Sequence, residues 1–216
     1  MAKSRLRWKR DTVVEVAVKN GVSVVAQLLE EPNLLFFEAF FPSGTAPDLR
    51  LEACPRLFCC AVTRQFLQQS VTGTLAGIAP VPGAPVPNLR IAGHLGSRRG
   101  TAWAGTVHER QFFLLSGEPG GLLREHDARA PASAGVGRVL ERLEPVDFHR
   151  TAGIEYACLW TFPLLNERLH LIHTVGVSVD PLMELHFDRP PRPEYRTFVD
   201  ILAGHGGLAD WGYAAR

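Results

Sequence analysis

The sequence has no apolar run of the roughly 18 residues that a membrane-spanning helix needs, and no apolar segment follows its charged first ten residues, MAKSRLRWKR. We therefore expect neither a secretory signal nor a membrane anchor, no membrane partner, and a cytoplasmic location. The sequence also lacks an excess of one charge, since 23 Lys and Arg residues against 22 Asp and Glu residues give +1. No strong field would draw the whole chain to nucleic acid or anionic lipid.

Sequence signatures of common enzyme classes are absent too. The chain has no GxSxG motif, no phosphate-binding loop ending in Gly-Lys-Ser/Thr, and no paired CxxC spacing. Ser116 lies in a glycine-rich loop and Arg98-Arg99 in a basic turn, but turn chemistry explains both. We expect no catalytic residue and no cofactor, and hence a protein that is not an enzyme. The four cysteines are predicted to be buried free thiols: Cys54, Cys59, Cys60 and Cys158.

Three histidines invite a metal hypothesis. His170, His173 and His186 lie within seventeen residues, and Glu184 is two residues before His186. The alternation from Thr174 to Val179 is typical of a strand, and on a strand that starts at His170 the first two histidines would point to opposite faces. We therefore expect no metal site. A small metal-dependent enzyme that uses this region stays open as an alternative.

Residues 12–41 are the most informative stretch that is present. Asn20-Gly21 separates two Val-rich runs and predicts a hairpin with a type I′ turn, because that turn needs two positive φ angles. Closure by two residues would place Ala17 opposite Val24 and Val16 opposite Val25. Glu30 to Asn33 predicts the next turn, and the Phe-rich run of residues 34–41 predicts a third strand. The stretch is therefore predicted to be an antiparallel meander.

The rest of the chain predicts short elements, as expected from its 20 Gly and 16 Pro residues. A helix is predicted near the C-terminus, because Tyr195, Phe198 and Leu202 share a face and Gly204 follows them. We therefore expect a β-rich α+β fold: an N-terminal meander forming a curved or barrel-like sheet, a mixed C-terminal region, and a short C-terminal helix. The other predicted elements are strands at 57–62, 101–107, 111–115, 154–160 and 170–179, and helices at 63–70 and 136–143.

Residues 1–10 are predicted to be a basic flexible arm, and residues 11–216 a single α+β domain. Residues 79–88, APVPGAPVPN, have four prolines and predict an extended crossing without sheet hydrogen bonds. The alternative organisation is two lobes, 11–78 and 89–216, joined by this crossing.

The N-terminal part resembles the immunity protein 26 family of bacterial polymorphic toxin systems. The family's order is a strand, a glycine turn, a second strand, a Pro-containing turn and an aromatic third strand. The resemblance covers about residues 9–90, and Arg10 stands in place of the family's usual glycine. In this chain the matching places are Arg10-Asp11-Thr12-Val13, Asn20-Gly21, Gln27-Leu28-Leu29, Glu30-Glu31-Pro32, Phe36-Phe37, the strand at 57–62 and the segment 70–80.

What the resemblance implies is a non-enzymatic immunity protein that binds and neutralises a cognate bacterial toxin. Such a protein needs contact area and complementary charge rather than a reactive group. Glu30, Glu31 and Glu38 are the acidic residues that we expect to bind the toxin. Besides the metal-dependent enzyme, a nucleic-acid-binding module that uses the basic arm remains an alternative, although the balanced charge gives us no reason to expect nucleic acid as a partner.

Overall fold

The computed structural model describes residues 7–45, 47–126 and 137–213, and within them it confirms the β-rich α+β fold. A curled six-stranded sheet, sheet A, has the order β12-β4-β3-β2-β1-β5. Its strands are β1 (Val13–Ala17), β2 (Val22–Leu28), β3 (Asn33–Pro42), β4 (Arg56–Val62), β5 (Val71–Thr74) and β12 (Leu159–Trp160), with η1 (Leu51–Ala53) before β4 and α1 (Arg64–Ser70) after it.

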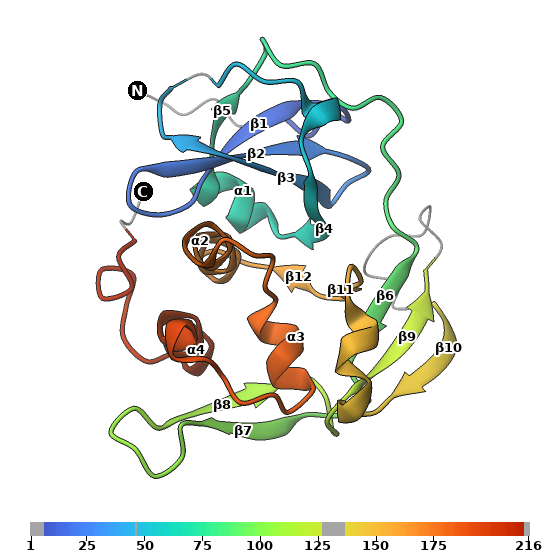
Figure 1. Cartoon of the computed structure of the whole chain (residues 1–216), viewed down its shortest axis with the longest axis vertical. Helices are drawn as coiled ribbons and strands as arrows, with labels where there is room; N and C mark the ends of the chain where they lie inside the picture. Colours follow the sequence, from blue (N-terminus) through green and yellow to red (C-terminus); the bar gives the residue numbers. More distant parts are fainter. Residues whose placement is uncertain (1–6, 46, 127–136, 214–216) are drawn as a thin grey trace.

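Two smaller sheets follow in the chain. Sheet B has the order β10-β9-β6-β11, and sheet C is the two-stranded ribbon β7-β8. Helices α2, α3 and α4 lie between sheet A and this ribbon (Figure 1). The elements are β6 (Leu89–Ala92), β7 (Arg98–Ala102), β8 (Arg110–Leu114), β9 (Gly121–Glu125), β10 (Arg138–Leu143), β11 (Glu155–Tyr156), η3 (Pro145–Thr151), α2 (Leu164–Val175), α3 (Pro181–His186), η4 (Pro193–Tyr195) and α4 (Arg196–Ala203).

The first hairpin has the predicted turn but a different register. Asn20 and Gly21 have φ angles of 54° and 73°, and the Val22 amide donates to the Lys19 carbonyl, so the type I′ turn is confirmed. The predicted pairing is wrong by one residue: Val16 lies opposite Val24, because Lys19 is left out of the ladder. In the observed register, apolar residues of both strands, such as Val16 and Val24, face the main core together. The predicted register would have placed Val25 and Gln27 beside the core residues of β1.

The excluded residue has a partner far along the chain. The Lys19 ammonium lies 3.0 Å from Glu167 Oε2 in α2, and Tyr213 donates a 2.7 Å hydrogen bond to the same oxygen. Gly212, with φ 79°, lies beside this lysine, because a Cβ there would come within 2.8 Å of Lys19 Cε. The residue left out of the hairpin ladder is therefore held by a long-range ion pair, which the local turn pattern could not predict.

The proline-rich crossing, residues 79–88, forms no strand and makes no ladder bonds, as predicted, but it is not extended throughout, because it turns at Pro82-Gly83, where Gly83 has φ 64°. It covers the face of sheet A that points away from the helices, where Ile78 and Ala84 join a second apolar cluster with Val25 and Phe37. Buried Gln27 holds the crossing in place: its amide nitrogen donates to the Val81 carbonyl at 3.0 Å, and its Oε1 accepts from the Val81 amide at 2.9 Å.

The main core contains residues from both sides of that crossing. Residues 154–160, predicted as one strand, form two: β11 pairs in parallel with β6, and after a bend β12 pairs in parallel with β4. This short segment connects sheet B to sheet A. Trp160, at the end of this segment, packs edge to face on Phe198 in the main core, with ring centroids 6.5 Å apart.

Three other predicted elements are wrong. Residues 164–175 form helix α2, so the strand at 170–179 does not exist, and the strand predicted at 101–107 lies earlier, at β7, since Trp103 and Gly105 adopt positive φ in a loop. The described part of the predicted helix at 136–143 forms β10, which pairs with β9. The predicted strands at 57–62 and 111–115 and the helices at 63–70 and near the C-terminus are confirmed as β4, β8, α1 and α4.

The hairpin turn makes a testable stability prediction. Gly21→Val should lower the free energy of unfolding by roughly 1–2 kcal/mol, because a β-branched residue is strained at positive φ. No heavy atom lies within 4 Å of a Cβ built on Gly21 or on Gly77, but only Gly21 has positive φ. Gly77→Val is therefore the matched control, and urea unfolding should show the loss for Gly21→Val alone. Equal stability of the two variants would contradict the assigned turn.

Candidate functional site

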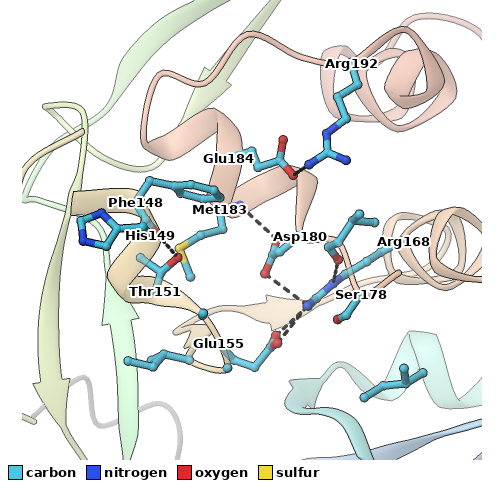
Figure 2. Close-up of a pocket in the computed structure, with 15 residues that line it drawn as sticks. Phe148, His149, Thr151, Glu155, Arg168, Ser178, Asp180, Met183, Glu184 and Arg192 are labelled. Carbon is cyan, nitrogen blue, oxygen red and sulfur yellow. Dashed lines mark hydrogen bonds and ion pairs between the residues drawn. The ribbon is translucent and has the colours of Figure 1, made fainter. Parts of the chain in front are cut away.

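The densest group of buried charges surrounds Arg168 in α2. Its side chain is 2% exposed, and its two terminal nitrogens donate to the Glu155 carboxylate at 2.6 and 2.8 Å. Nε donates to the Val179 carbonyl at 3.0 Å, and Asp180 Oδ2 lies 3.3 Å from Nη1 (Figure 2). The guanidinium also lies 3.9 Å from the centre of the Phe58 ring. One arginine thus connects β11, the start of α3 and sheet A.

This network lies beside a pocket of about 260 Å³. Figure 2 shows the pocket between η3, β11, α2 and α3, with Arg192 at its upper edge. Phe148, Met183 and Leu57 give it apolar walls, and its charged lining comprises Glu155, Asp180, Glu184, Arg168 and Arg192. Three carboxylates against two guanidinium groups leave the lining with an excess of negative charge.

Glu184 forms the second part of the network. Its Oε1 accepts from the Tyr195 hydroxyl at 2.6 Å and from Arg192 Nη2 at 3.2 Å. Arg192 is 48% exposed, whereas Glu184 is 8% exposed, so the pair runs from the solvent into the core. Burial, followed by this carboxylate, raises the pKa of Tyr195. The phenol therefore stays a hydrogen-bond donor to Glu184 over the physiological pH range.

Asp180 is the third carboxylate of the lining, in addition to the pairs that Glu155 forms with Arg168 and Glu184 forms with Arg192. Burial raises its pKa to about 6, and Glu155 and Glu184 add to that rise while Arg168 opposes it. Its Oδ1 accepts from the Met183 amide at 3.0 Å and caps α3. The Asp180 carboxylate can therefore take up a proton just below neutral pH. Its neighbours Arg168 and Glu155 are joined to each other by two hydrogen bonds. These bonds hold α2, β11 and the start of α3 together.

The histidines predicted from the sequence are placed in three different surroundings. His186, in α3, stacks on Tyr156 with ring centroids 4.2 Å apart, and burial lowers its pKa to about 3. His173 packs on Phe40, and His170 is half-buried on the same helix. His170 and His173 therefore both lie on helix α2, so the prediction that they lie on a strand is wrong. Within residues 7–45, 47–126 and 137–213, no group of three or more His, Cys, Asp or Glu side chains could hold a metal ion.

The acidic residues predicted to bind a partner are all exposed but do not form one cluster. Glu30 and Glu31 lie in the turn before β3, and Arg10 donates to Glu30 at 2.6 Å. Glu38 lies further along β3, about 17 Å from the strand's first residue at roughly 3.3 Å per residue. Of the basic arm, residues 1–6 lie outside the described residues, and Trp8 donates to the Leu29 carbonyl at 2.9 Å.

The other sequence candidates have internal partners. Ser116 is fully buried, accepts from the His94 amide at 3.0 Å and donates to the Glu118 carbonyl at 2.7 Å. Arg98 donates to the Leu185 and His186 carbonyls and pairs with Asp188 at 2.8 Å. Both side chains therefore act within the fold. Ser116 lies in a loop, as predicted, whereas the basic turn predicted at Arg98-Arg99 is wrong, because both residues lie on strand β7 and pair with β8.

Sequence reasoning missed an apolar surface on the β7-β8 ribbon. Phe112 and Leu114 point into the core, while the alternate residues Phe113 and Leu115 are 62% and 81% exposed. Leu95, just before β7, is 101% exposed. We call this exposed surface the ribbon face. It is made of the outward residues Arg99, Thr101, Gln111 and Phe113 of the hairpin and of the exposed Leu95 and Leu115 next to its strands. The run Phe112 to Leu115 was a signal, because a ribbon covered on one face needs apolar residues only at alternate positions.

No family model, curated protein or solved structure matches this chain, so its resemblance to the immunity protein 26 family stays a prediction. Across the described ranges, 7–45, 47–126 and 137–213, no helix has both the length and the apolar character needed to cross a membrane.

Removing Arg168 should destabilise the fold strongly. Arg168→Met leaves Glu155 and Asp180 buried without their counter-charge, and breaking such a pair costs about 3–5 kcal/mol. Arg150→Met is the matched control, because Arg150 makes the same two-bond contact with Glu141 at the surface. Thermal unfolding should show a large drop for the first variant and little change for the second. Similar small changes in both would mean that the buried network does not stabilise the fold.

The raised pKa of Asp180 makes a prediction about pH. Because the folded-state pKa, about 6, exceeds the unfolded value near 3.8, the folded state binds more protons between these values, and Asp180 lowers stability as pH rises from 4 to 7. Asp180→Asn keeps the helix cap but cannot ionise. Compared with this variant, the parent should lose about 2 kcal/mol of unfolding free energy over that range. Parallel stability curves from urea unfolding would contradict the assigned pKa.

Proposed function

We propose that the chain is a non-enzymatic binding protein of the immunity type, which neutralises a bacterial protein toxin in the cytoplasm by covering part of its surface. The observation that carries the proposal is the ribbon face. An exposed Phe beside two exposed Leu residues is the kind of apolar surface that soluble proteins reserve for contacts. Aromatic and Arg side chains are also the residues most enriched among those that dominate binding energy.

The reactive side chains support the same proposal through their bonds. Arg168, Glu184 and Ser116 are held by partners within the chain, so they position elements instead of meeting a substrate. The ribbon face, in contrast, is built on β8, whose other side packs on α4. A rigid base of this kind lowers the entropy lost when a partner binds.

Co-expression tests the proposal. Each candidate toxin encoded beside this gene is expressed with and without the chain, and one of them should stop growth only when the chain is absent. Phe113→Ser should then weaken binding of that toxin at least tenfold, because truncating a central aromatic anchor typically costs more than 1 kcal/mol. Val177→Ser, which removes a similarly exposed apolar side chain after α2, is the matched control. Isothermal titration calorimetry measures both affinities.

The same experiment compares the ribbon face with the acidic residues predicted from the sequence. If the toxin instead contacts Glu30, Glu31 or Glu38, Glu31→Lys should slow association at about 0.05 M salt, and the difference should shrink at about 0.5 M because the charges are screened. An effect of Glu31→Lys without one of Phe113→Ser would move the contact to sheet A. Protection by neither wild-type nor variant chain against any neighbouring toxin would overturn the immunity proposal.

A further inference from the structure

The ribbon face carries one charge. Across the β7-β8 ladder, Arg99 lies opposite Phe113 and Thr101 opposite Gln111, so the two outward rows combine an arginine, an aromatic ring and two uncharged polar groups. Apolar side chains continue past the end of the strand, since Leu115, the residue after β8, is also exposed.

Leu95 lies near the same end of the ribbon, in the segment that leads into β7. A Cβ built on Gly117 would come within 2.4 Å of the Leu95 carbonyl oxygen, so the two backbones are in contact at this end of the ribbon. Glycine at position 117 is what permits that approach. Leu95 and Leu115, both exposed, therefore lie on the two chain segments that meet at the open end of the hairpin, opposite its connecting loop.

Arg99 differs from the arginines beside it. Arg98 is paired with Asp188 at 2.8 Å, and Arg110 with Asp200 at 2.5 Å. The Arg99 guanidinium instead lies over the Phe113 ring, 5.4 Å from its centre, and within the described residues no carboxylate lies within ion-pair distance of it. Stacking on an aromatic ring leaves the edge of a guanidinium, with its N–H donors, directed outward.

We propose that the ribbon face binds a protein segment that carries a carboxylate beside apolar side chains. The carboxylate would accept from Arg99, in the two-bond geometry that guanidinium favours, while apolar side chains cover Phe113, Leu115 and Leu95. This inference rests on the proposed function, because it names the chemistry of the toxin surface that the chain would cover.

The observations favour a protein over a membrane or a nucleic acid. A basic residue near anionic lipid contributes only about 1 kcal/mol, and the face has a single one. Binding to nucleic acid would need several contacts between basic side chains and phosphates, each of which steepens the slope of log affinity against log salt concentration by about one. One arginine stacked on an aromatic ring, with two exposed Leu side chains next to the same strands, matches the mixed composition of a protein interface.

Two synthetic peptides test the inference on the full chain by NMR. One alternates Leu and Asp over eight residues, and the other alternates Leu and Lys. The acidic peptide should shift the amide resonances of β7 and β8 and bind at least tenfold more tightly than the basic one. Arg99→Glu should reverse this preference, and Phe113→Ser should weaken both peptides. Arg138→Glu, a charge reversal at an exposed position on β10, is the matched control and should change neither affinity.

In the peptide experiment, each of three results would overturn the inference: shifts that map away from the ribbon, an acidic preference that survives Arg99→Glu, or Arg99-dependent binding to vesicles of 30% phosphatidylserine in phosphatidylcholine without peptide binding. Circular dichroism of each variant separates loss of binding from loss of folding. If a neighbouring toxin binds the chain but Arg99→Glu has no effect on it, the inference falls and the proposed function stands. If the peptides behave as expected but no toxin is neutralised, the proposed function falls alone.

Discussion

The arrangement of this molecule depends on the burial of one guanidinium group, that of Arg168. Taking a charge out of water costs several kcal/mol, and only close partners offset that cost. Glu155 and Asp180 are those partners, and they come from different segments, β11 and the start of α3. Because these three groups meet, the ion pairs hold α2, β11 and the start of α3 together. Residues 159–160 follow β11 and are thereby directed to the edge of sheet A as β12.

Helix α2 makes a second buried contact through the residue before this arginine. Successive residues on a helix point about 100° apart, so Glu167 and Arg168 face different parts of the molecule. Glu167 pairs with Lys19 of the first hairpin and accepts a hydrogen bond from Tyr213, the last described residue. Arg168 pairs with Glu155 of β11 and with Asp180 at the start of α3. One turn of one helix therefore joins segments from near the two ends of the chain with Glu155 and Asp180 in its second half.

This use of polar residues explains which parts of the structure the sequence could predict. The meander, the proline-rich crossing and α4 depend on local signals such as Asn20-Gly21 and Gly204, and these signals were sufficient. Helix α2 was missed because Asn166, Glu167 and Arg168 are buried in it, which obscures the apolar period of 3.6 residues. The hairpin register was missed for the same reason, as the partner of Lys19 lies 148 residues away. The network and the ribbon face required the tertiary structure, because their members are far apart or differ only in exposure.

The parallel pairing of β12 with β4 has a consequence for the order in which the protein is made. Leu159 pairs with Ala61, so the two strands are separated by 98 positions in the chain. During synthesis the meander emerges long before β12, and the hydrogen-bonding edge of β4 waits unpaired until the segment after β11 has left the ribosome. At about 5–20 residues per second that interval lasts roughly 5–20 seconds. Over this time an open strand edge can pair with other nascent chains, so the chain's solubility during expression should depend on how quickly its second half is translated.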